Sequence, residues 1–467
     1  MASALHYRTL AETAADISSG RLSSEEVTRH TLERIGELEP RLRAFAAVRE
    51  KDAMAEAREA DARRARGETL GPLHGVPLAV KDLCAMEGTA TCAGGFFRTG
   101  FDPAHTATVV RRLQDAGAII VGKVQLTEGA WGAHHPDVPP PVNPWAPDHW
   151  SGASSSGSGV AVAAGLSYGA IGTDTAGSIR FPSTCNRLVG LKPTWGRVSR
   201  HGVFRLSDTL DHVGPITRSV LDAALMFDAI AGPDPADPTA LDVPPPGSAQ
   251  AARNGSLEGV RIGLDTAYAL DSVEPAIAAS LKRAIAALES AGAEIVEIRL
   301  PEMREHLLRL YMSAAVEAAI SHAATYPSEA ESYSDGYRSF LNLAHSTSAV
   351  DYAATAIWRR EFRGSLARLF KTVDMVIAPT MPVEPPTLAA FDAVASAPPE
   401  AVVSLMLYTI PFNAAGIPTL TLPMDTTDAG VPLGFQLIGS ELSEARLLSA
   451  GAAYEQVAGY AADHPAM

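Results

Sequence analysis

The stretch "HWSGASSSGSGVAVAAG", residues 149–165, decides how this chain folds. Its first half is rich in serine and glycine, a composition typical of flexible linkers. From Val160 onward the chain is apolar and has no polar side chains that would keep it in solvent. A linker does not continue in this way, so we expect a tight loop of small residues that leads directly into a buried helix.

Two apolar segments before this stretch predict parallel strands. They are "GVPLAVKD" (75–82) and "AGAIIVGK" (116–123), and a helical pattern, "TATVVRRLQDAG" (106–117), leads into the second. A strand, a helix and a further strand in this order are typical of parallel strands joined by crossover helices.

The second half of the chain repeats this alternation. A Pro/Gly/Ala-rich segment, about 232–255, connects the two halves. After it we expect strands at 260–264, 294–299 and 374–380 and within "GIPTLTLP" and "VPLGFQLIG", with helices at 274–292, about 303–370 and from Ser443. Because strands and helices alternate on both sides of the connection, one continuous sheet is more economical than two domains.

Composition limits the classes of partner. With 46% hydrophobic and 19% charged residues among 467, the chain can bury a large core. Its net charge of -15 repels a nucleic-acid backbone, so we expect no nucleic-acid partner. No secretory signal, membrane span or metal-like cysteine grouping is found in the sequence. These features predict a cytoplasmic protein that binds no membrane.

Two familiar glycine motifs do not fit the opening stretch. Gly152 and Gly157 have the spacing of a phosphate loop, but Ser158 and Gly159 stand where lysine and Ser/Thr are needed. The order of residues 152–156 also lacks the last glycine of the G-x-S-x-G nucleophile elbow.

A third pattern fits better. "TDTAGSIRFPS" (173–183) is a second loop of small residues, in which backbone N–H groups can turn toward one point and form an oxyanion hole around Ser178. A serine nucleophile needs a base, and none of the 13 histidines lies in a motif that defines a triad. Lys81 is the alternative, since burial lowers a lysine pKa by up to roughly 3–5 units.

Taken together, these motifs resemble the amidase signature family of serine hydrolases. "GVPLAVKD", "GASSSGSGVAVAAG", "GTDTAGSIRFPS" and "VGLKPTWGRVSRHGV" occur in the family's order and at similar spacing, and the likeness covers most of the chain. The resemblance implies an α/β fold with a large mixed, mostly parallel sheet covered by helices on both faces. It also implies one domain over residues 1–467, with a signature core at about 70–230 and a helical substrate cap at about 303–370.

The resemblance also implies a catalytic site that needs no metal or organic cofactor. Lys81 would be the general base, Ser154 the proton relay and Ser178 the acylated nucleophile. The oxyanion would bind the backbone N–H groups of Thr175, Ala176, Gly177 and Ser178. Asp174, Arg180 and Ser155 would support these loops, and Cys185 is expected to be a buried, inert thiol.

Several positions depart from the family pattern. In the family the bridging serine follows a cis peptide bond, and the residue before it is usually glycine, whereas Ala153 precedes Ser154 here. Ser156 and Ala176 also stand where glycines are common. The added side chains restrict the backbone, so these positions bear on the geometry of both loops.

The sequence favours a small-molecule amide as substrate. The proline-rich loop 131–150 is expected to be ordered and to wall the pocket, with Trp131 and His134 as the candidate pocket residues. Aromatic walls favour aryl or alkyl amides, and carbamates and esters use the same acyl chemistry. A homodimer is left open.

Two alternatives stand beside this interpretation. One is the glutaminase-type subunit of an aminoacyl-tRNA amidotransferase. Against it, Gly129 in "VQLTEGAWGAHHP" (124–136) replaces an aromatic residue typical of that group. The other is a catalytically silent subunit or binding protein, which the intact lysine and serines argue against.

Overall fold

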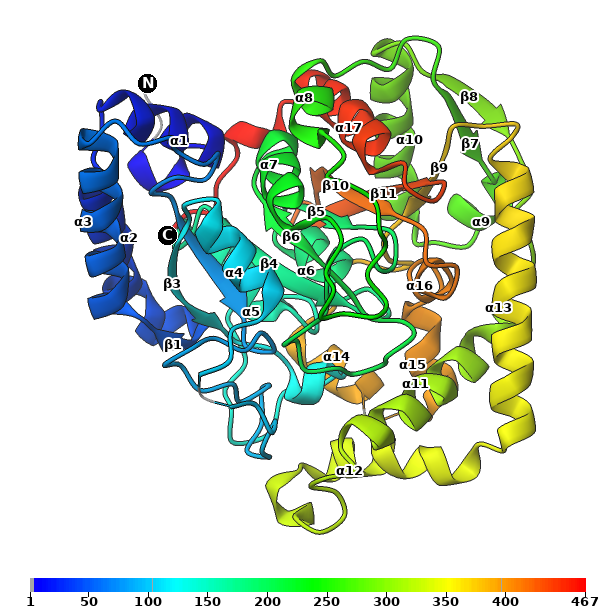
Figure 1. Ribbon diagram of the computed structural model, residues 1–467. Helices are drawn as coiled ribbons and strands as arrows, with labels where there is room; N and C mark the ends of the chain where they lie inside the picture. Colours follow the sequence, from blue (N-terminus) through cyan, green and yellow to red (C-terminus); the bar gives the residue numbers. More distant parts are fainter. Residues whose placement is uncertain (1–3, 103, 396) are drawn as a thin grey trace.

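A single twisted sheet forms the centre of the computed structural model, which describes residues 4–102, 104–395 and 397–467 (Figure 1). Within these residues eleven strands pair in the order β1-β3-β2-β4-β6-β5-β10-β11-β9-β7-β8. In chain order they are β1 (Phe45–Val48), β2 (Pro77–Lys81), β3 (Ile119–Val124), β4 (Gly169–Asp174), β5 (Val189–Lys192), β6 (His212–Thr217), β7 (Arg261–Leu264), β8 (Glu294–Glu297), β9 (Met375–Pro379), β10 (Thr419–Thr426) and β11 (Pro432–Gly439).

The sheet is continuous across the two halves of the chain, as predicted, because β5 pairs with β10. It is mixed, but the expectation of a mostly parallel sheet is wrong: six of the ten neighbouring pairs are antiparallel. The strands β10 and β11 form a hairpin, and β6 lies between β4 and β5, antiparallel to both. Antiparallel strands can be joined by short connections, and the order of motifs along the chain does not reveal the direction in which two strands pair.

Helices cover both faces of the sheet. They are α1 (Leu10–Ser19), α2 (Ser24–Leu42), α3 (Glu50–Ala65), α4 (Thr108–Asp115), α5 (Ser156–Ala163), α6 (Arg180–Cys185), α7 (Val220–Ile230), α8 (Ser248–Arg253), α9 (Thr266–Ala269), α10 (Pro275–Ser290), α11 (Leu307–Ser321), α12 (Asp335–Asn342), α13 (Ala349–Leu369), α14 (Leu388–Ala395), α15 (Pro399–Leu405), α16 (Ile410–Ala414) and α17 (Glu444–Ala458).

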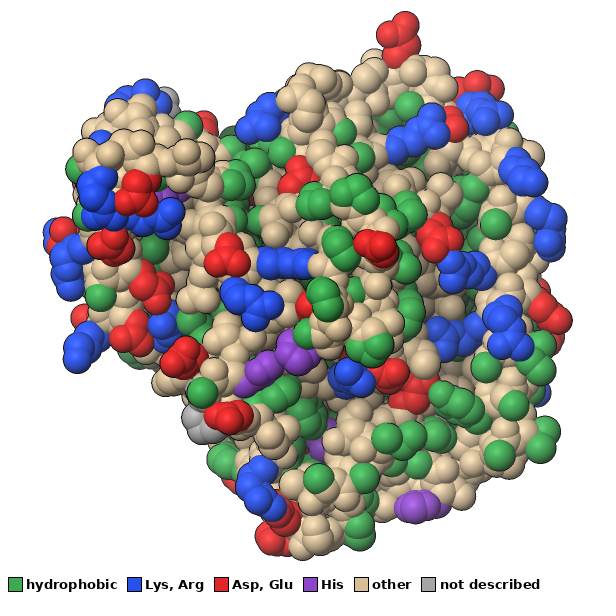
Figure 2. All heavy atoms as spheres, in the orientation of Figure 1, with side chains coloured by type: hydrophobic (Ala, Val, Ile, Leu, Met, Phe, Trp, Pro, Cys, Tyr) green, Lys and Arg blue, Asp and Glu red, His purple; other side chains and the backbone are tan. Residues whose placement is uncertain are grey.

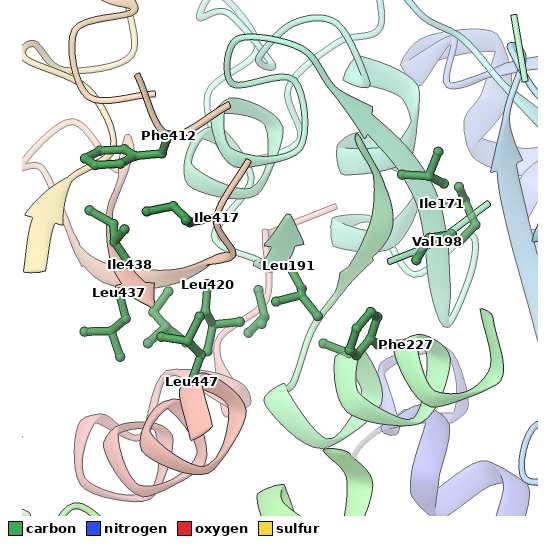
Figure 3. Close-up of a cluster of buried hydrophobic side chains, with 14 of the residues drawn as sticks. Ile171, Leu191, Val198, Phe227, Phe412, Ile417, Leu420, Leu437, Ile438 and Leu447 are labelled. Atoms are coloured by element: carbon green, nitrogen blue, oxygen red, sulfur yellow. The ribbon is translucent and has the colours of Figure 1, made fainter. Parts of the chain in front are cut away.

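Two apolar cores lie on the two faces. Side chains alternate along a strand, so Leu78 and Val80 of β2 join one core and Ala79 joins the other. The first core includes α4, α7 and α17, and the second includes α2, α3 and α5. Figure 3 shows part of the first core, where Leu447 of α17 lies beside Leu420 of β10. The predicted arrangement of helices on both faces is therefore confirmed.

The opening stretch forms a loop followed by the buried helix α5, as predicted. All eight residues of α5 are buried. A side chain at Gly157 would meet the Ala44 carbonyl oxygen at 2.4 Å, so glycine lets α5 approach the neighbouring backbone closely. Gly152 has a φ of 83° and is equally crowded, by the backbone of Pro182. The glycines therefore serve close packing rather than flexibility.

The region 303–370 is mainly helical, as predicted, and contains α11, α12 and α13 (Figure 1). Two further helices, α14 and α15, were not predicted. The loop 131–150 has no helix or strand, and the connection 232–255 is irregular up to α8, which packs against α7 and α17.

The surface in Figure 2 carries acidic and basic side chains interspersed with one another, with no large area of one sign. Exposed ion pairs also occur in the structure, such as Arg283 with Asp425. Of the helices in the described part of the chain, none is long and apolar enough to cross a membrane.

Candidate active site

Lys81 and Ser154 meet at the carboxyl ends of the strands β2 and β4. The strands β2 and β4 are parallel neighbours, so the end of β2 at Lys81 lies beside Thr173 near the end of β4. The Lys81 ammonium donates hydrogen bonds to Ser154 Oγ at 2.7 Å and to Thr173 Oγ1 at 2.8 Å. Sequence reasoning missed Thr173, because only strand pairing brings it to the lysine.

Lys81 has an unusual proton affinity. The side chain is fully buried, and burial lowers its pKa to about 7, although the negative charge of Asp211 opposes this change. A large fraction of the lysine is therefore neutral near pH 7, and a neutral amine can accept a proton from a hydroxyl.

The loop before α5 accommodates Ala153, the first departure from the family pattern. The peptide bond between Ala153 and Ser154 is cis, as the resemblance implies. The Ala153 side chain packs in a small apolar cluster with Trp150, Phe181 and Cys185. Ser155 Oγ donates to the Thr173 carbonyl oxygen at 3.2 Å, which ties the loop to β4 and agrees with a supporting role.

The loop 174–178 is held by an ion pair that is fully buried. Arg180 donates from Nε and Nη2 to the two carboxylate oxygens of Asp174 at 3.0 and 2.9 Å. Asp174 also accepts from the Gly177 and Ile179 N–H groups at 2.8 and 3.1 Å. Burial alone would raise the pKa of Asp174, but the Arg180 charge holds that pKa well below its usual value.

The backbone carbonyls of this loop are also engaged. The Asn413 amide donates to the Asp174 carbonyl oxygen at 2.9 Å. Thr409 Oγ1 donates to the Ala176 carbonyl oxygen, and the Phe181 N–H donates to the Gly177 carbonyl oxygen at 2.7 Å. These contacts leave the N–H groups of three residues without an acceptor in the described part of the chain: Thr175, Ala176 and Ser178. The Gly177 N–H differs from the expectation, because Asp174 already occupies it.

Ser178 lines a cavity, and its hydroxyl has no hydrogen-bond partner among the described residues. The structure thus joins Lys81 to Ser154 directly, while Ser178 lies on the cavity wall together with Ala153. Within the described residues the hydroxyls of Ser154 and Ser178 form no hydrogen bond to each other.

Aromatic and aliphatic side chains dominate the cavity, and no charged residue is found among its described lining residues. The lining comprises Ala130, Trp131, Gly132, Trp150, Ala153, Thr175, Ala176, Ser178, Phe181, Leu206, Tyr311, Ala314, Phe340, Phe391, Val394, Val402, Leu405, Met406 and Ile410. Part of this wall comes from α11, α12, α14 and α15. The methyl groups of Ala153 and Ala176 make the wall near Ser178 more apolar than glycine would.

Of the two predicted pocket residues, only Trp131 lines the cavity. Its indole N–H donates to the Tyr311 hydroxyl at 3.0 Å. His134 is not among the described residues that line this cavity. Its Nε2 lies 3.2 Å from Ser156 Oγ, so the ring is held against the first turn of α5. Ser156, the third departure from the family pattern, therefore has a partner that glycine would lack.

The fold explains why glycine and not an aromatic residue stands at position 129. A side chain there would meet the hydroxyl oxygen of Tyr337, from α12, at 2.2 Å. Glu128 next to it accepts a hydrogen bond from the Ser334 N–H at 3.0 Å, and Ser334 caps α12. The helical region thus fills the space that an aromatic residue would need at position 129.

The described residues of the site include neither a metal-binding cluster nor a reactive thiol. Among the described residues no group of three or more His, Cys, Asp or Glu side chains could hold a metal ion. Cys185 is buried, as predicted, and burial raises the pKa of its thiol well above the usual range. A thiol in this state is a poor nucleophile.

Asp174→Asn tests the buried ion pair. We expect a loss of about 3–5 kcal/mol in the free energy of unfolding, because Arg180 would keep its charge without a partner. Urea unfolding followed by circular dichroism measures the loss. Asp425→Asn, which breaks the exposed pair with Arg283, is the control and should change stability far less. Equal losses in both variants would contradict the assigned role of Asp174.

A mixed α/β sheet that brings a buried lysine of lowered pKa to serines at an apolar cavity has the arrangement of a hydrolase. The chain belongs to the amidase signature family, whose members are enzymes that hydrolyse amides: it matches the family Amidase over residues 26–448.

Curated relatives of this chain include an amidase and an amidotransferase subunit. "Putative amidase AmiD" of Mycobacterium tuberculosis is 44% identical over 451 residues, which cover 97% of this chain and 94% of that protein. A glutamyl-tRNA(Gln) amidotransferase subunit of Myxococcus xanthus is 38% identical over 483 residues, with 96% of each covered. Among solved structures, the native peptide amidase from Stenotrophomonas maltophilia superposes with a TM-score of 0.83 at 32% identity and covers 98% of both chains.

Proposed function

We propose that the protein hydrolyses neutral aryl or alkyl amides through an acyl-enzyme on Ser178, with carbamates and esters as further substrates. The absence of charged side chains among the described residues of the cavity wall carries this proposal. Because apolar walls bind apolar groups and cannot compensate a desolvated charge, the substrate is neutral where it contacts them.

In the proposed chemistry, Ser154 relays the proton of Ser178 to Lys81. Ser178 Oγ bonds to the amide carbonyl carbon while its proton passes to Ser154 Oγ and the Ser154 proton passes to Lys81. The carbonyl oxygen becomes negative, and the free N–H groups of Thr175, Ala176 and Ser178 stabilise it.

Breakdown of this intermediate reverses the proton path. The C–N bond breaks, and the proton on Lys81 returns through Ser154 to the departing amine nitrogen. A water molecule then attacks the acyl carbon, gives its proton along the same path and releases the acid, so Ser178 regains its hydroxyl.

A glutaminase is the second candidate, because the identity to the amidotransferase relative is 38%. Free glutamine carries an α-ammonium and an α-carboxylate. Burying either in this cavity without a charged partner would be costly, since none of the described lining residues supplies one.

A panel of substrates separates the two candidates. The purified protein is given an acyl anilide, a primary aliphatic amide, an aryl carbamate, an ester and L-glutamine, and kcat/KM is measured for each. We expect the anilide to exceed glutamine by roughly 10²-fold or more. Ser178→Ala is run in parallel to subtract contaminating hydrolases. Efficient cleavage of glutamine with no turnover of the neutral compounds would overturn the proposal.

A further inference from the structure

Asp211 is a buried carboxylate that the proposed reaction does not use. It precedes β6 and lies behind the loop that carries Ser178. Thr175 Oγ1 donates a hydrogen bond to Asp211 Oδ1 at 2.6 Å. The N–H groups of Leu206 and Ser207 donate to the same carboxylate at 2.9 and 3.1 Å. Asp211 therefore connects the Ser178 loop to a second segment that lines the cavity through Leu206.

Thr175 depends on this contact for its orientation. Its backbone N–H is one of the three free donors of the loop, and its side chain is hydrogen-bonded to Asp211. Rotation of Thr175, which lines the cavity, would change the direction of this N–H. A donor contributes to catalysis only where it points at the developing oxyanion, so the carboxylate fixes a donor that it does not itself provide.

Strand pairing also brings Asp211 toward Lys81, because β4 and β6 pair Asp174 with His212 and Thr173, the partner of Lys81, with Val213. Burial raises the pKa of Asp211 to about 6, so the group is mostly ionised above pH 7. Its negative charge raises the pKa of Lys81 and opposes the effect of burial. Among the described residues, Arg200 and Tyr337 also interact electrostatically with Asp211, and Cys84 and Asp174 also raise the pKa of Lys81. Loss of the Asp211 charge should therefore lower the pKa of Lys81 further.

We propose that Asp211 is a positioning residue of the amide-hydrolysing site, which holds Thr175 in place for the oxyanion and stabilises the ammonium that Lys81 forms on taking a proton. This inference rests on the proposed function of Ser178 and Lys81. It assigns two separable effects to one carboxylate, one through a hydrogen bond and one through charge.

Two variants separate the effects in the full-length protein. Thr175→Val removes the hydrogen bond and keeps the charge. We expect kcat for an anilide to fall on the order of 10²-fold, with KM nearly unchanged and the pH midpoint of kcat/KM where it is in the wild type. Asp211→Asn removes the charge as well. We expect kcat to fall at least as far and the midpoint to move to lower pH by about one unit or more.

Asp222→Asn is the matched control. Asp222 is also a buried carboxylate, and it accepts from the Leu10 and Ala11 N–H groups at 3.0 Å, where it joins α7 to α1. The control should keep the wild-type kcat and pH midpoint. A purely structural Asp211 would reduce activity only in proportion to the folded fraction and leave the midpoint unchanged, and that result would overturn the inference. If Asp211→Asn does not fold, an unchanged kcat in Thr175→Val overturns it equally.

A second readout keeps this test apart from the substrate proposal. The rate of fluorophosphonate labelling at Ser178 depends on the same donors and base but on no particular amide. If the wild type is labelled and cleaves no neutral amide, slower labelling of Thr175→Val still supports the role of Asp211 while the substrate proposal falls. If the wild type takes no label at Ser178, both proposals fall.

Discussion

Replacing Lys81 with methionine lowers amide turnover by about 10²–10⁴-fold while the protein stays folded. This range is typical of the loss of a general base. Methionine is apolar and has a similar length, and Lys81 is buried without a carboxylate in hydrogen-bond contact, so its removal leaves no opposite charge unpaired there. Turnover of the best anilide and the midpoint of thermal unfolding, both compared with the wild type, measure the effect.

We expect the same lysine to set the acidic side of the pH profile. Below its pKa of about 7 Lys81 is an ammonium and cannot take the Ser154 proton. We therefore expect kcat/KM of the wild type to rise as the pH increases through about 7 and then to level off.

Lys123→Met is the control for Lys81. Lys123 is a fully buried lysine on the neighbouring strand β3, but it pairs with Asp82 and does not line the cavity. We expect this variant to lose stability, since Asp82 is left unpaired, and to keep its turnover per folded molecule. Near-normal turnover in Lys81→Met, or a similar loss of turnover in both variants, would remove Lys81 from the mechanism.

Replacing Ser178 with alanine abolishes both amide turnover and labelling by a fluorophosphonate. In the wild type we expect Ser178 Oγ to bond to phosphorus while fluoride leaves and the serine proton passes toward Lys81. Alanine has no oxygen to form this bond. Digestion followed by mass spectrometry places the label on the peptide that contains residue 178, and a steady-state assay measures the loss of turnover.

Ser183→Ala provides a matched control on the same segment. Ser183 is buried in α6, and its hydroxyl already donates to the Ile179 carbonyl oxygen at 2.8 Å. This variant should be labelled at the wild-type rate. Label on another residue of the folded wild type, or full labelling of Ser178→Ala, would show that Ser178 is not the nucleophile.

Sequence patterns predicted strands and helices correctly where an uninterrupted apolar stretch requires burial. The apolar stretch from Val160 could not stay in solvent, and it is the buried helix α5. The run ending at Lys81 has no polar residue before the lysine, and it is the buried strand β2. The strands β1, β4, β5 and β6 and the short helices α14 and α15 were missed, because segments this short carry little periodicity.

The candidate site was predicted in part for a similar reason. Lys81, Ser154 and Ser178 stand in motifs that the sequence displays directly. Thr173 and Asp211 carry no motif of their own, and only strand pairing and the return of the chain at β6 bring them to the site. The His134 ring lies against Ser156 of α5, and a loop sequence does not reveal which side of the loop faces the cavity.

By itself the sequence determined the family, the continuous sheet and the small residues around the two serines, since these follow from local polarity, residue size and the order of motifs. Only the tertiary structure decided which N–H groups of loop 174–178 are free and that Tyr337 fills the space beside Gly129. The lowered pKa of Lys81 was also decided only by the tertiary structure. All three depend on distances between segments far apart in the chain, because burial, charge and hydrogen bonding act through space and not along the sequence.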